Sequence, residues 1–278
     1  MIEMERLALN RIASPNYGLG EFFELAKELG FSKVELRNDI RGGAIIDGMP
    51  AKEADKLARE NGISIITINA LQKFNLTAVR EKNLGELRTM IELCKAIHCP
   101  AIVLCPNNDP KDTRTKEVRY KETVDALVAY GPIFKDAGML GYVEPLGFGI
   151  SSLASIVLAQ NAIKESGFGC YKVLIDTFHL FLGPDDASTF GTSYDVSMTG
   201  LIHVSGVEDD IPPDQYLDCH RLLPGPRDNM KSKAVIEAAL KKGYNGDISF
   251  EPFSDRVQNM SRKEFSDAMR ASLKYLME

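Results

Sequence analysis

Four residues whose side chains bind metals or move protons follow short apolar runs in the second half of the chain: Glu144, Asp176, His203 and Glu251. Carboxylates and imidazoles bind divalent cations such as Mn²⁺, Zn²⁺, Co²⁺ and Mg²⁺, and both groups can also accept and donate protons. The uninterrupted apolar run at 173–175, before Asp176, is typical of a strand buried on both faces in a parallel sheet. The pattern therefore indicates a metal or acid–base site at the ends of parallel strands.

A repeating unit along the chain supplies the elements that would position these residues. It consists of an amphipathic helix, usually a glycine, a short connection and an apolar strand that ends in a polar residue. The pattern predicts strands at 6–10, 33–37, 63–69, 101–105, 141–144, 171–176, 201–204 and 247–251. It predicts helices around 22–29 and at 51–61, 83–97, 118–137, 152–166, 193–198 and 233–242, with a last one starting at the capping box Ser261-x-x-Glu264.

Eight strands alternating with helices over 278 residues predict an α/β fold, a (β/α)8 TIM barrel, as one domain spanning 1–278. The alternative is an open doubly wound sheet, but no G-x-G-x-x-G follows the first strand. In a barrel, the carboxyl ends of all strands open onto one face, where active sites are built. The polar residues expected there are Asn10, Arg37, Asn69, Cys105, Glu144, Asp176 with His179, His203 and Glu251.

Each candidate also has a structural interpretation. An acid that ends a strand often caps the following helix, and His203 within an apolar run is compatible with a hydrogen-bonded core histidine. Capping alone does not account for ligand-type residues at the ends of four successive strands. The joint pattern favours a metal site.

The bulk composition narrows the function classes. Thirty-three Lys and Arg against 39 Asp and Glu give a net charge of −6, and no basic cluster stands out, so nucleic acid and anionic membranes are poor candidate partners. Five cysteines without C-x-x-C spacing argue against a disulfide framework and a structural zinc cluster, and we expect buried free thiols. No apolar run approaches the ~20 residues that span a bilayer, and the N-terminal segment does not resemble a signal peptide, so a cytoplasmic location is expected.

Several segments resemble the metal-site strands of the xylose-isomerase-like sugar isomerases and epimerases. These segments are Val143-Glu144-Pro145, the stretch 174–179, Ile202-His203-Val204 and 248–252. Within that superfamily, the inosose isomerases of inositol catabolism have similar segments in the same order as 34–37, 68–71, 207–209 and 221–225. The resemblance covers nearly the whole chain.

The resemblance implies one divalent metal ion held by Glu144, Asp176, His203 and Glu251, with Arg37, Asn69, His179 and Arg221 lining a substrate pocket. It also implies that Glu144 and Glu251 catalyse proton transfer through a metal-bound enediolate of a keto-inositol or keto-sugar. Two loops depart from the family pattern: Ser205-Gly206 replaces an acid after His203, and Pro224-Gly225-Pro226-Arg227 replaces Pro-Gly-x-Gly. These departures leave the substrate open.

The sequence is also compatible with other functions. The same enediolate could expel a hydroxyl group, which would make the protein an inosose dehydratase, or the barrel could bind sugar or metal without catalysis. An endonuclease of the same superfamily is the least favoured, because the chain has only four histidines and a net negative charge. Arg221 could be a surface ion-pair partner instead of a pocket residue. A homo-oligomer is possible, and the substrate would be a small molecule.

Overall fold

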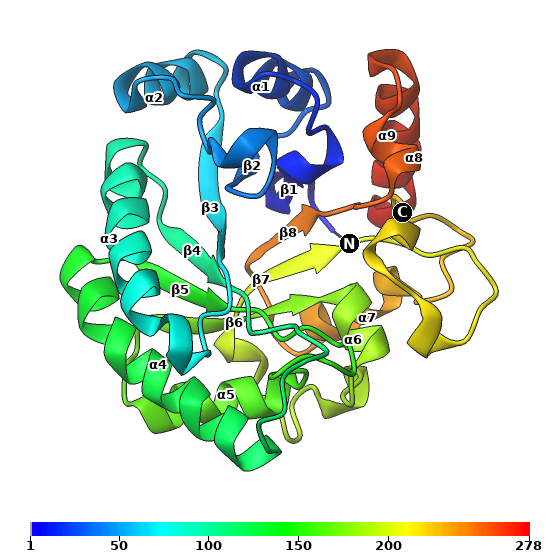
Figure 1. The fold of residues 1–278 in the computed structure, drawn as a ribbon. Coiled ribbons are helices and arrows are strands. Elements are labelled where there is room, and N and C mark those ends of the chain that lie inside the picture. Colours follow the sequence, from blue (N-terminus) through cyan, green and yellow to red (C-terminus); the bar gives the residue numbers. More distant parts are fainter. Residues whose placement is uncertain (1) are drawn as a thin grey trace.

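The computed structural model describes residues 2–278, in which parallel strands pair in chain order, β1 to β8, and close into a barrel (Figure 1). The strands are β1 Leu7–Asn10, β2 Lys33–Arg37, β3 Ser64–Leu71, β4 Ala101–Leu104, β5 Leu140–Val143, β6 Tyr171–Asp176, β7 Thr199–Val204 and β8 Asp247–Phe250. Closure comes from the pairing of β1 with β8, in which Ala8 lies opposite Ser249. The predicted (β/α)8 TIM barrel is confirmed.

Helices surround the barrel (Figure 1). They are α1 Leu19–Glu28, α2 Ala51–Glu60, α3 Arg80–Ala96, α4 Lys116–Ala137, α5 Ile156–Ser166, α6 Thr177–Leu182, α7 Ser232–Lys241, α8 Asp255–Gln258 and α9 Arg262–Met277. Their ends follow local sequence signals. The Thr115 and Ser155 side chains cap α4 and α5, the predicted capping box of Ser261 and Glu264 starts α9, and Gly138 and Gly167 end α4 and α5 in the left-handed conformation.

The barrel interior is divided into an apolar and a polar layer. Buried Ala70, Val103, Leu174 and Leu201 pack together inside the barrel, and Cys105 completes this cluster. Side chains fill the interior of such a barrel, so it is a packed core and not a pore. Above this layer, the strands end in buried polar residues, and this polar layer forms the floor of the candidate site.

The segment after β6 differs from the expectation. The predicted helix at 193–198 is reduced to the 3-10 turn Val196–Met198, and a true helix, α6, begins directly after β6. The carboxylate of Asp176 explains this start, because it accepts a hydrogen bond from the backbone nitrogen of Phe178 at 2.8 Å. His179 therefore lies on the first turn of a helix.

The five cysteines are free, but their burial was only partly predicted. Cys94, Cys99 and Cys105 are buried, Cys170 is half-buried and Cys219 is exposed. The expectation of burial was wrong for Cys219 because it lies in the long connection between β7 and α7, which runs over the surface.

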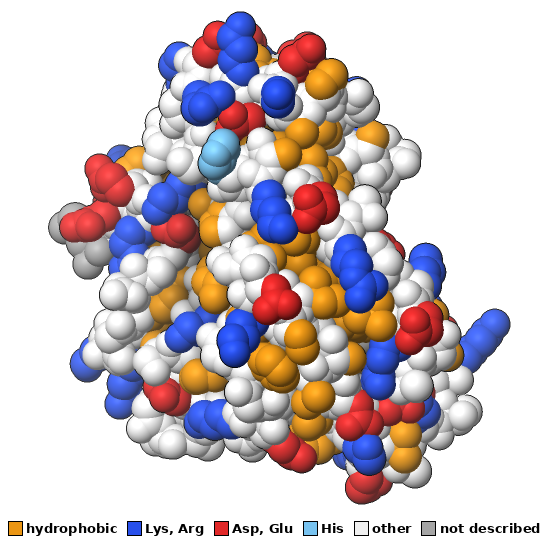
Figure 2. Space-filling view, turned by 90° about the vertical axis from the view of Figure 1, so that its left-hand side faces the viewer, with side chains coloured by type: hydrophobic (Ala, Val, Ile, Leu, Met, Phe, Trp, Pro, Cys, Tyr) orange, Lys and Arg blue, Asp and Glu red, His pale blue; other side chains and the backbone are white. Residues whose placement is uncertain are grey.

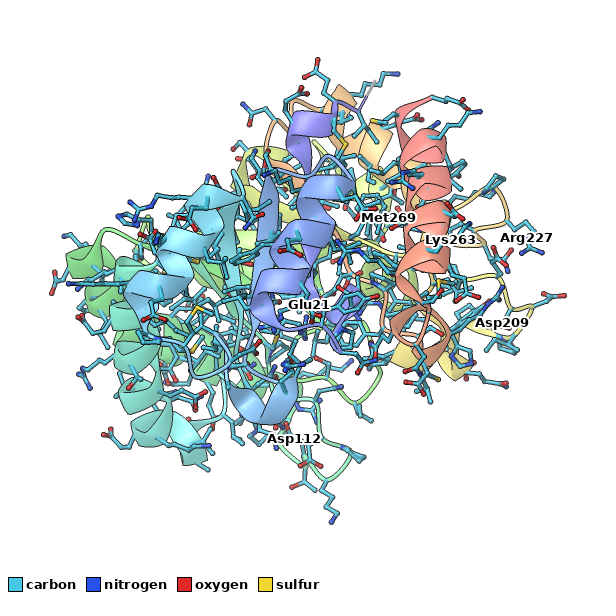
Figure 3. All side chains as sticks on the ribbon, turned by 90° about the horizontal axis from the view of Figure 1, so that it is seen from above. Glu21, Asp112, Asp209, Arg227, Lys263 and Met269 are labelled. Atoms are coloured by element: carbon cyan, nitrogen blue, oxygen red, sulfur yellow. The ribbon has the colours of Figure 1, made fainter. Side chains whose placement is uncertain are left out.

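The outer surface has a mixed charge pattern. Figure 2 shows Lys and Arg side chains interspersed with acidic ones on one face, with hydrophobic side chains between them. Arg227 lies at the edge of the molecule (Figure 3), where it is exposed and pairs with Glu208 at 2.6 Å. Within residues 2–278, no helix combines the length and apolar character needed to cross a membrane.

Candidate metal and substrate site

Strands β5 to β8 bring together the four predicted metal ligands. Glu144 and Glu251 are the first residues after β5 and β8, Asp176 ends β6 and His203 lies near the end of β7. Each residue offers one ligand atom, and these atoms lie within 4.8 Å of one another. All four residues are buried, so the ends of four neighbouring strands form one compact donor group.

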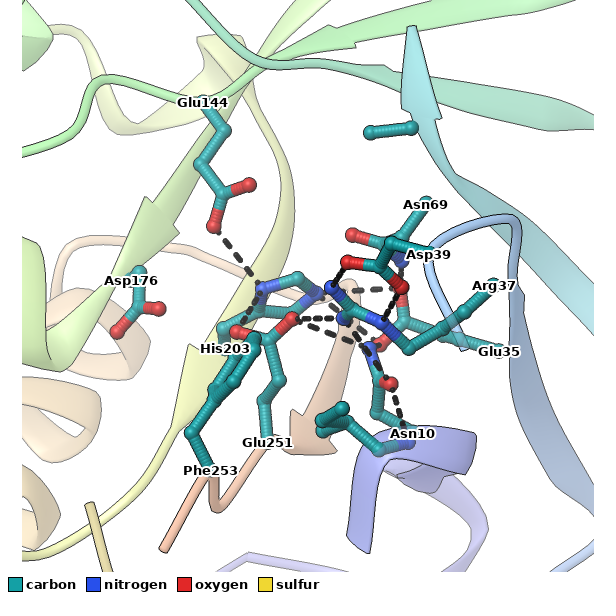
Figure 4. A network of polar contacts seen from close by, with 12 residues as sticks. Asn10, Glu35, Arg37, Asp39, Asn69, Glu144, Asp176, His203, Glu251 and Phe253 are labelled. Atoms are coloured by element: carbon teal, nitrogen blue, oxygen red, sulfur yellow. Dashed lines mark hydrogen bonds and ion pairs between the residues drawn. The ribbon is translucent and has the colours of Figure 1, made fainter. Parts of the chain in front are cut away.

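His203 is the centre of this group (Figure 4). Its Nδ1 atom lies 3.2 Å from Glu144 Oε1 and 3.1 Å from Glu251 Oε2. Burial alone would lower the pKa of His203, but the carboxylates of Glu251 and Glu35 outweigh burial and raise that pKa well above its ordinary value. His203 is thus buried and hydrogen-bonded, as its structural interpretation expects, and its partners are acids of the candidate site.

Asp176 is compatible with both interpretations of an acid that ends a strand, as the cap of the next helix and as a candidate metal ligand. Oδ1 caps α6 through Phe178, while Oδ2 accepts a hydrogen bond from Arg221 Nη2 at 2.5 Å. Burial raises the pKa of Asp176 to about 7, although the nearby Arg221 acts in the opposite direction. The helix-capping role therefore leaves one carboxylate oxygen directed toward the site.

Two buried arginines hold Glu251. Arg37 donates to Oε1 at 2.7 Å and pairs with Asp39, while Arg221 donates to Oε2 at 2.8 Å. The surface alternative for Arg221 is wrong, because the residue is 1% exposed and its guanidinium lies over the Phe253 ring at 4.6 Å. Burial would raise the pKa of Glu251, but His203 and Arg221 together hold it well below its usual range.

The donor set fits a divalent cation. One imidazole and three carboxylates are ligands that Zn²⁺, Mn²⁺ and Co²⁺ accept. The four ligand atoms lie within 4.8 Å of one another, which is close enough for all of them to face one ion. The guanidiniums of Arg37 and Arg221 and the imidazole of His203 partly balance the buried carboxylates.

A cavity of about 170 Å³ opens onto this group. It is lined by Arg37, Asp39, Asn69, Gln72, Cys105, Asn108, Glu144, Leu146, Phe148, His179, Asp218, Arg221, Glu251 and Phe253. The volume is below the ~300–1,000 Å³ of drug-sized ligand sites. A small molecule fits such a space better than a polymer does.

All four predicted substrate-binding residues, Arg37, Asn69, His179 and Arg221, line the cavity. His179 Nδ1 is buried without a hydrogen-bond partner in the protein. Burial and the nearby Arg221 lower the pKa of His179 to about 3, so its ring is neutral near pH 7. Asn69 donates to Glu35 at 3.0 Å, which leaves its oxygen as the side-chain atom available to a ligand.

Some residues at the site had no role assigned from the sequence, although one of them, Cys105, was expected at this end of the barrel. Glu35 contacts His203 from inside β2, Cys105 donates its thiol hydrogen to Glu144 Oε2 at 3.3 Å, and Asn108 lines the cavity with a buried unpartnered Oδ1. Glu35 had one available signal, which is an acid between two apolar residues, Val34 and Leu36, in the middle of a predicted strand. Asn108 lies in a connecting loop and has no comparable signal.

A larger cavity of about 730 Å³ lies beside the candidate site. Its lining comes from the start of α4, the loop before α5 and the segments around Pro184 and Pro213, and it shares Phe148 with the site. Its lining is mainly apolar and lacks a cluster of acids and histidines, so the metal chemistry belongs to the smaller cavity.

Comparison with known proteins supports this geometry at the level of family. Residues 23–278 match the model of the xylose isomerase-like TIM barrel family. A xylose isomerase domain-containing protein from Salmonella typhimurium is 35% identical, with a TM-score of 0.92, and the match covers 100% of this chain and 99% of that one. No curated protein matches the chain.

Two more distant structures share the fold. The IOLI protein, solved with a bound zinc atom, is 19% identical with a TM-score of 0.89, over 98% of this chain and 97% of that one. D-psicose 3-epimerase from Clostridium cellulolyticum, solved with D-tagatose, is 17% identical with a TM-score of 0.78, over 98% of both chains. With its closed barrel, its strand-end donor group and a family model that matches most of its length, this chain belongs to the xylose isomerase-like TIM barrel family.

Proposed function

We propose that this chain is a single-domain, divalent-metal-dependent isomerase or epimerase of a small, uncharged keto-inositol or keto-sugar. The observation that carries the proposal is the buried group of Glu144, Asp176, His203 and Glu251 at the floor of a small polar cavity. The fold shared with sugar epimerases and with a zinc-containing IOLI protein supports it.

The four residues would hold one divalent ion. Bound there, the ion would supply Lewis acidity that lowers the cost of removing a proton next to a carbonyl. The protein contributes a dry, buried setting and two carboxylates that can carry that proton. Return of the proton to a neighbouring carbon isomerises the substrate, and return to the opposite face epimerises it.

The two glutamates have different neighbours, which suggests different roles. Both oxygens of Glu251 accept hydrogen bonds from guanidinium groups, of Arg37 and of Arg221. His203 contacts both glutamates, and the other partner of Glu144 is the uncharged thiol of Cys105. Since charged donors weaken a base more than a thiol does, we assign the abstraction of the carbon-bound proton to Glu144. For return to the opposite face, Glu251 would take a proton from a substrate hydroxyl group and pass it to the carbon, and Glu144 would give its proton back to that hydroxyl oxygen.

The charge of the cavity favours an uncharged substrate. Its two cationic side chains are already paired, Arg37 with Asp39 and Glu251, and Arg221 with Asp176, Asp218 and Glu251. No other Lys or Arg of the described chain lines this cavity, and its acids outnumber its cations. A phosphate group would therefore meet like charges. Hydroxyl groups can bond to His179, Asn69 and Asn108, and the carbon skeleton can lie against Phe253.

Deuterium wash-in followed by NMR tests the proposal. The protein is incubated in D₂O, with Mn²⁺ or with a chelator, and with a panel of inososes, ketohexoses and their phosphates. We expect deuterium at the carbon next to the carbonyl of an unphosphorylated member, only when metal is present. Metal binding without exchange in any panel member would contradict an isomerase and support a non-catalytic binding barrel. Loss of water from the product would identify a dehydratase.

A further inference from the structure

Glu35 lies behind His203, on the side of the ring opposite the candidate metal position. It is in the middle of β2 and has no exposed surface. Its two oxygens lie 3.0 and 3.1 Å from His203 Nε2, while the other ring nitrogen, Nδ1, faces Glu144 and Glu251 (Figure 4). The histidine is thus held between one acid on its inner side and the ligand group on its outer side.

The Glu35 carboxylate is itself fixed by surrounding donors. Asn10 Nδ2 donates to Oε1 at 3.1 Å, and both Asn69 Nδ2, at 3.0 Å, and the Thr67 hydroxyl donate to Oε2. These partners come from the neighbouring strands β1 and β3. With both oxygens occupied and no exposed surface, Glu35 cannot turn toward the cavity and act as a metal ligand.

This arrangement determines which nitrogen of His203 can bind a metal. An ionised carboxylate only accepts hydrogen bonds, so Nε2 must carry the hydrogen that it donates to Glu35. A metal ion binds a ring nitrogen only in place of its proton. With Nε2 keeping its hydrogen for Glu35, the nitrogen left to bind the ion is Nδ1, which is the atom that faces the other ligands.

We propose that Glu35 is a positioning residue that holds the His203 ring so that Nδ1 is presented to the divalent ion. The inference rests on the proposed function, because it needs a metal at this site. Partners of this kind, behind a metal-binding histidine, typically change metal affinity about 10–100-fold when they are altered.

Cobalt binding to the metal-free protein tests the inference without using activity. Chelator competition gives the Co²⁺ dissociation constant, and the visible absorption spectrum of bound Co²⁺ reports the ligand geometry. Glu35→Gln removes the charge and leaves the Nε2 hydrogen with a weaker acceptor. Glu35→Asp keeps a carboxylate for the surrounding donors but shortens it by one methylene, so it no longer reaches Nε2. Glu122→Gln, at an ion-paired glutamate on α4 outside the cavity, is the matched control.

We expect the dissociation constant to rise about 10–100-fold in both Glu35 variants, with an altered cobalt spectrum, and to stay within twofold of wild type in Glu122→Gln. Far-UV circular dichroism verifies folding; if Glu35→Gln does not fold, Glu35→Asp decides. If Glu35→Asp bound Co²⁺ with the affinity and the spectrum of the wild type, the inference would be overturned and the proposed function would stand. Failure of the wild-type protein to bind Co²⁺ would overturn the proposed function and the inference with it.

Discussion

Glu144 and Glu251 contribute the same functional group to the site, yet their neighbours differ. His203 contacts both of them, but Glu251 is also held by two guanidiniums, whereas the other partner of Glu144 is a thiol. A buried carboxylate with two charged donors remains ionised and is a weak base. The roles of the two residues should therefore be separable by substitution.

We expect Glu144→Gln to abolish deuterium exchange into the substrate, because an amide cannot accept the first proton. Glu251→Gln should keep slow exchange but lose product formation by a factor of about 10²–10⁴, the usual contribution of a general acid or base. NMR of a single incubation in D₂O measures both quantities, and metal content is determined for each variant. Exchange that survives in Glu144→Gln and disappears in Glu251→Gln would reverse the assignment.

His179 should bind the substrate without titrating in the working range. Its pKa is lowered to about 3 by burial and by Arg221, so the ring is neutral from about pH 5 upward. We expect His179→Asn to lower kcat/KM about tenfold, the value of one lost hydrogen bond, without moving either limb of the pH profile. If a limb near neutral pH disappears in this variant, His179 is a proton carrier.

Among the elements, the loop between β4 and α4 is held by several side-chain hydrogen bonds. It carries Asn108 to the cavity and is folded around Asp112, whose carboxylate accepts hydrogen bonds from Asn107 and from the backbone and side chain of Arg114. The hydrogen bonds from Arg114 lower the pKa of Asp112 below its ordinary value. The loop is thus held by an anion whose protonation should loosen it.

Replacement of Asp112 should therefore lower the stability of the protein by an amount that depends on pH. A carboxyl group whose folded pKa is lowered stabilises the protein above its unfolded pKa of about 3.9, and this contribution is lost as the pH falls toward the folded pKa. We expect Asp112→Asn to cost about 2 kcal/mol at pH 7 and progressively less below pH 4. Thermal unfolding of both proteins from pH 3 to 8 measures this. A constant difference in Tm over that range would contradict the expectation.

In the molecule as a whole, closure of the barrel brings together buried acids from strands on different sides of the barrel. Glu35, Glu144, Asp176 and Glu251 come from strands that are far apart in the chain, and close burial of like charges costs free energy unless cations balance them. A bound divalent cation should therefore stabilise the entire fold and not only the loops around the site.

We expect Mn²⁺, Co²⁺ or Zn²⁺ at a hundred times its dissociation constant to add about 2.7 kcal/mol to the free energy of unfolding. For a chain of this size, that raises Tm by roughly 5 °C. Differential scanning fluorimetry with each metal and with chelator provides the measurement. Asp176→Asn keeps the helix cap but loses a ligand charge, so its Tm should respond much less. An unchanged wild-type Tm with every metal would argue against the site.

Eight strands, most of the helices and the face of the barrel that carries the candidate site could be predicted from the sequence. Helical periodicity, glycine and serine caps and short apolar runs are local signals, and their regular alternation leads to a closed barrel. Once the barrel was predicted, Glu144, Asp176, His203 and Glu251 had to meet, because all parallel strands end on one face.

Only the tertiary structure decided how these residues interact. Arg221 was compatible with a surface ion pair until the fold buried it between Asp176 and Glu251. Contact between Glu35 and His203 joins strands on opposite sides of the barrel, 168 positions apart in the chain. Hydrogen bonds and ion pairs depend on distances of a few ångströms between such residues, and no local pattern in the sequence encodes those distances.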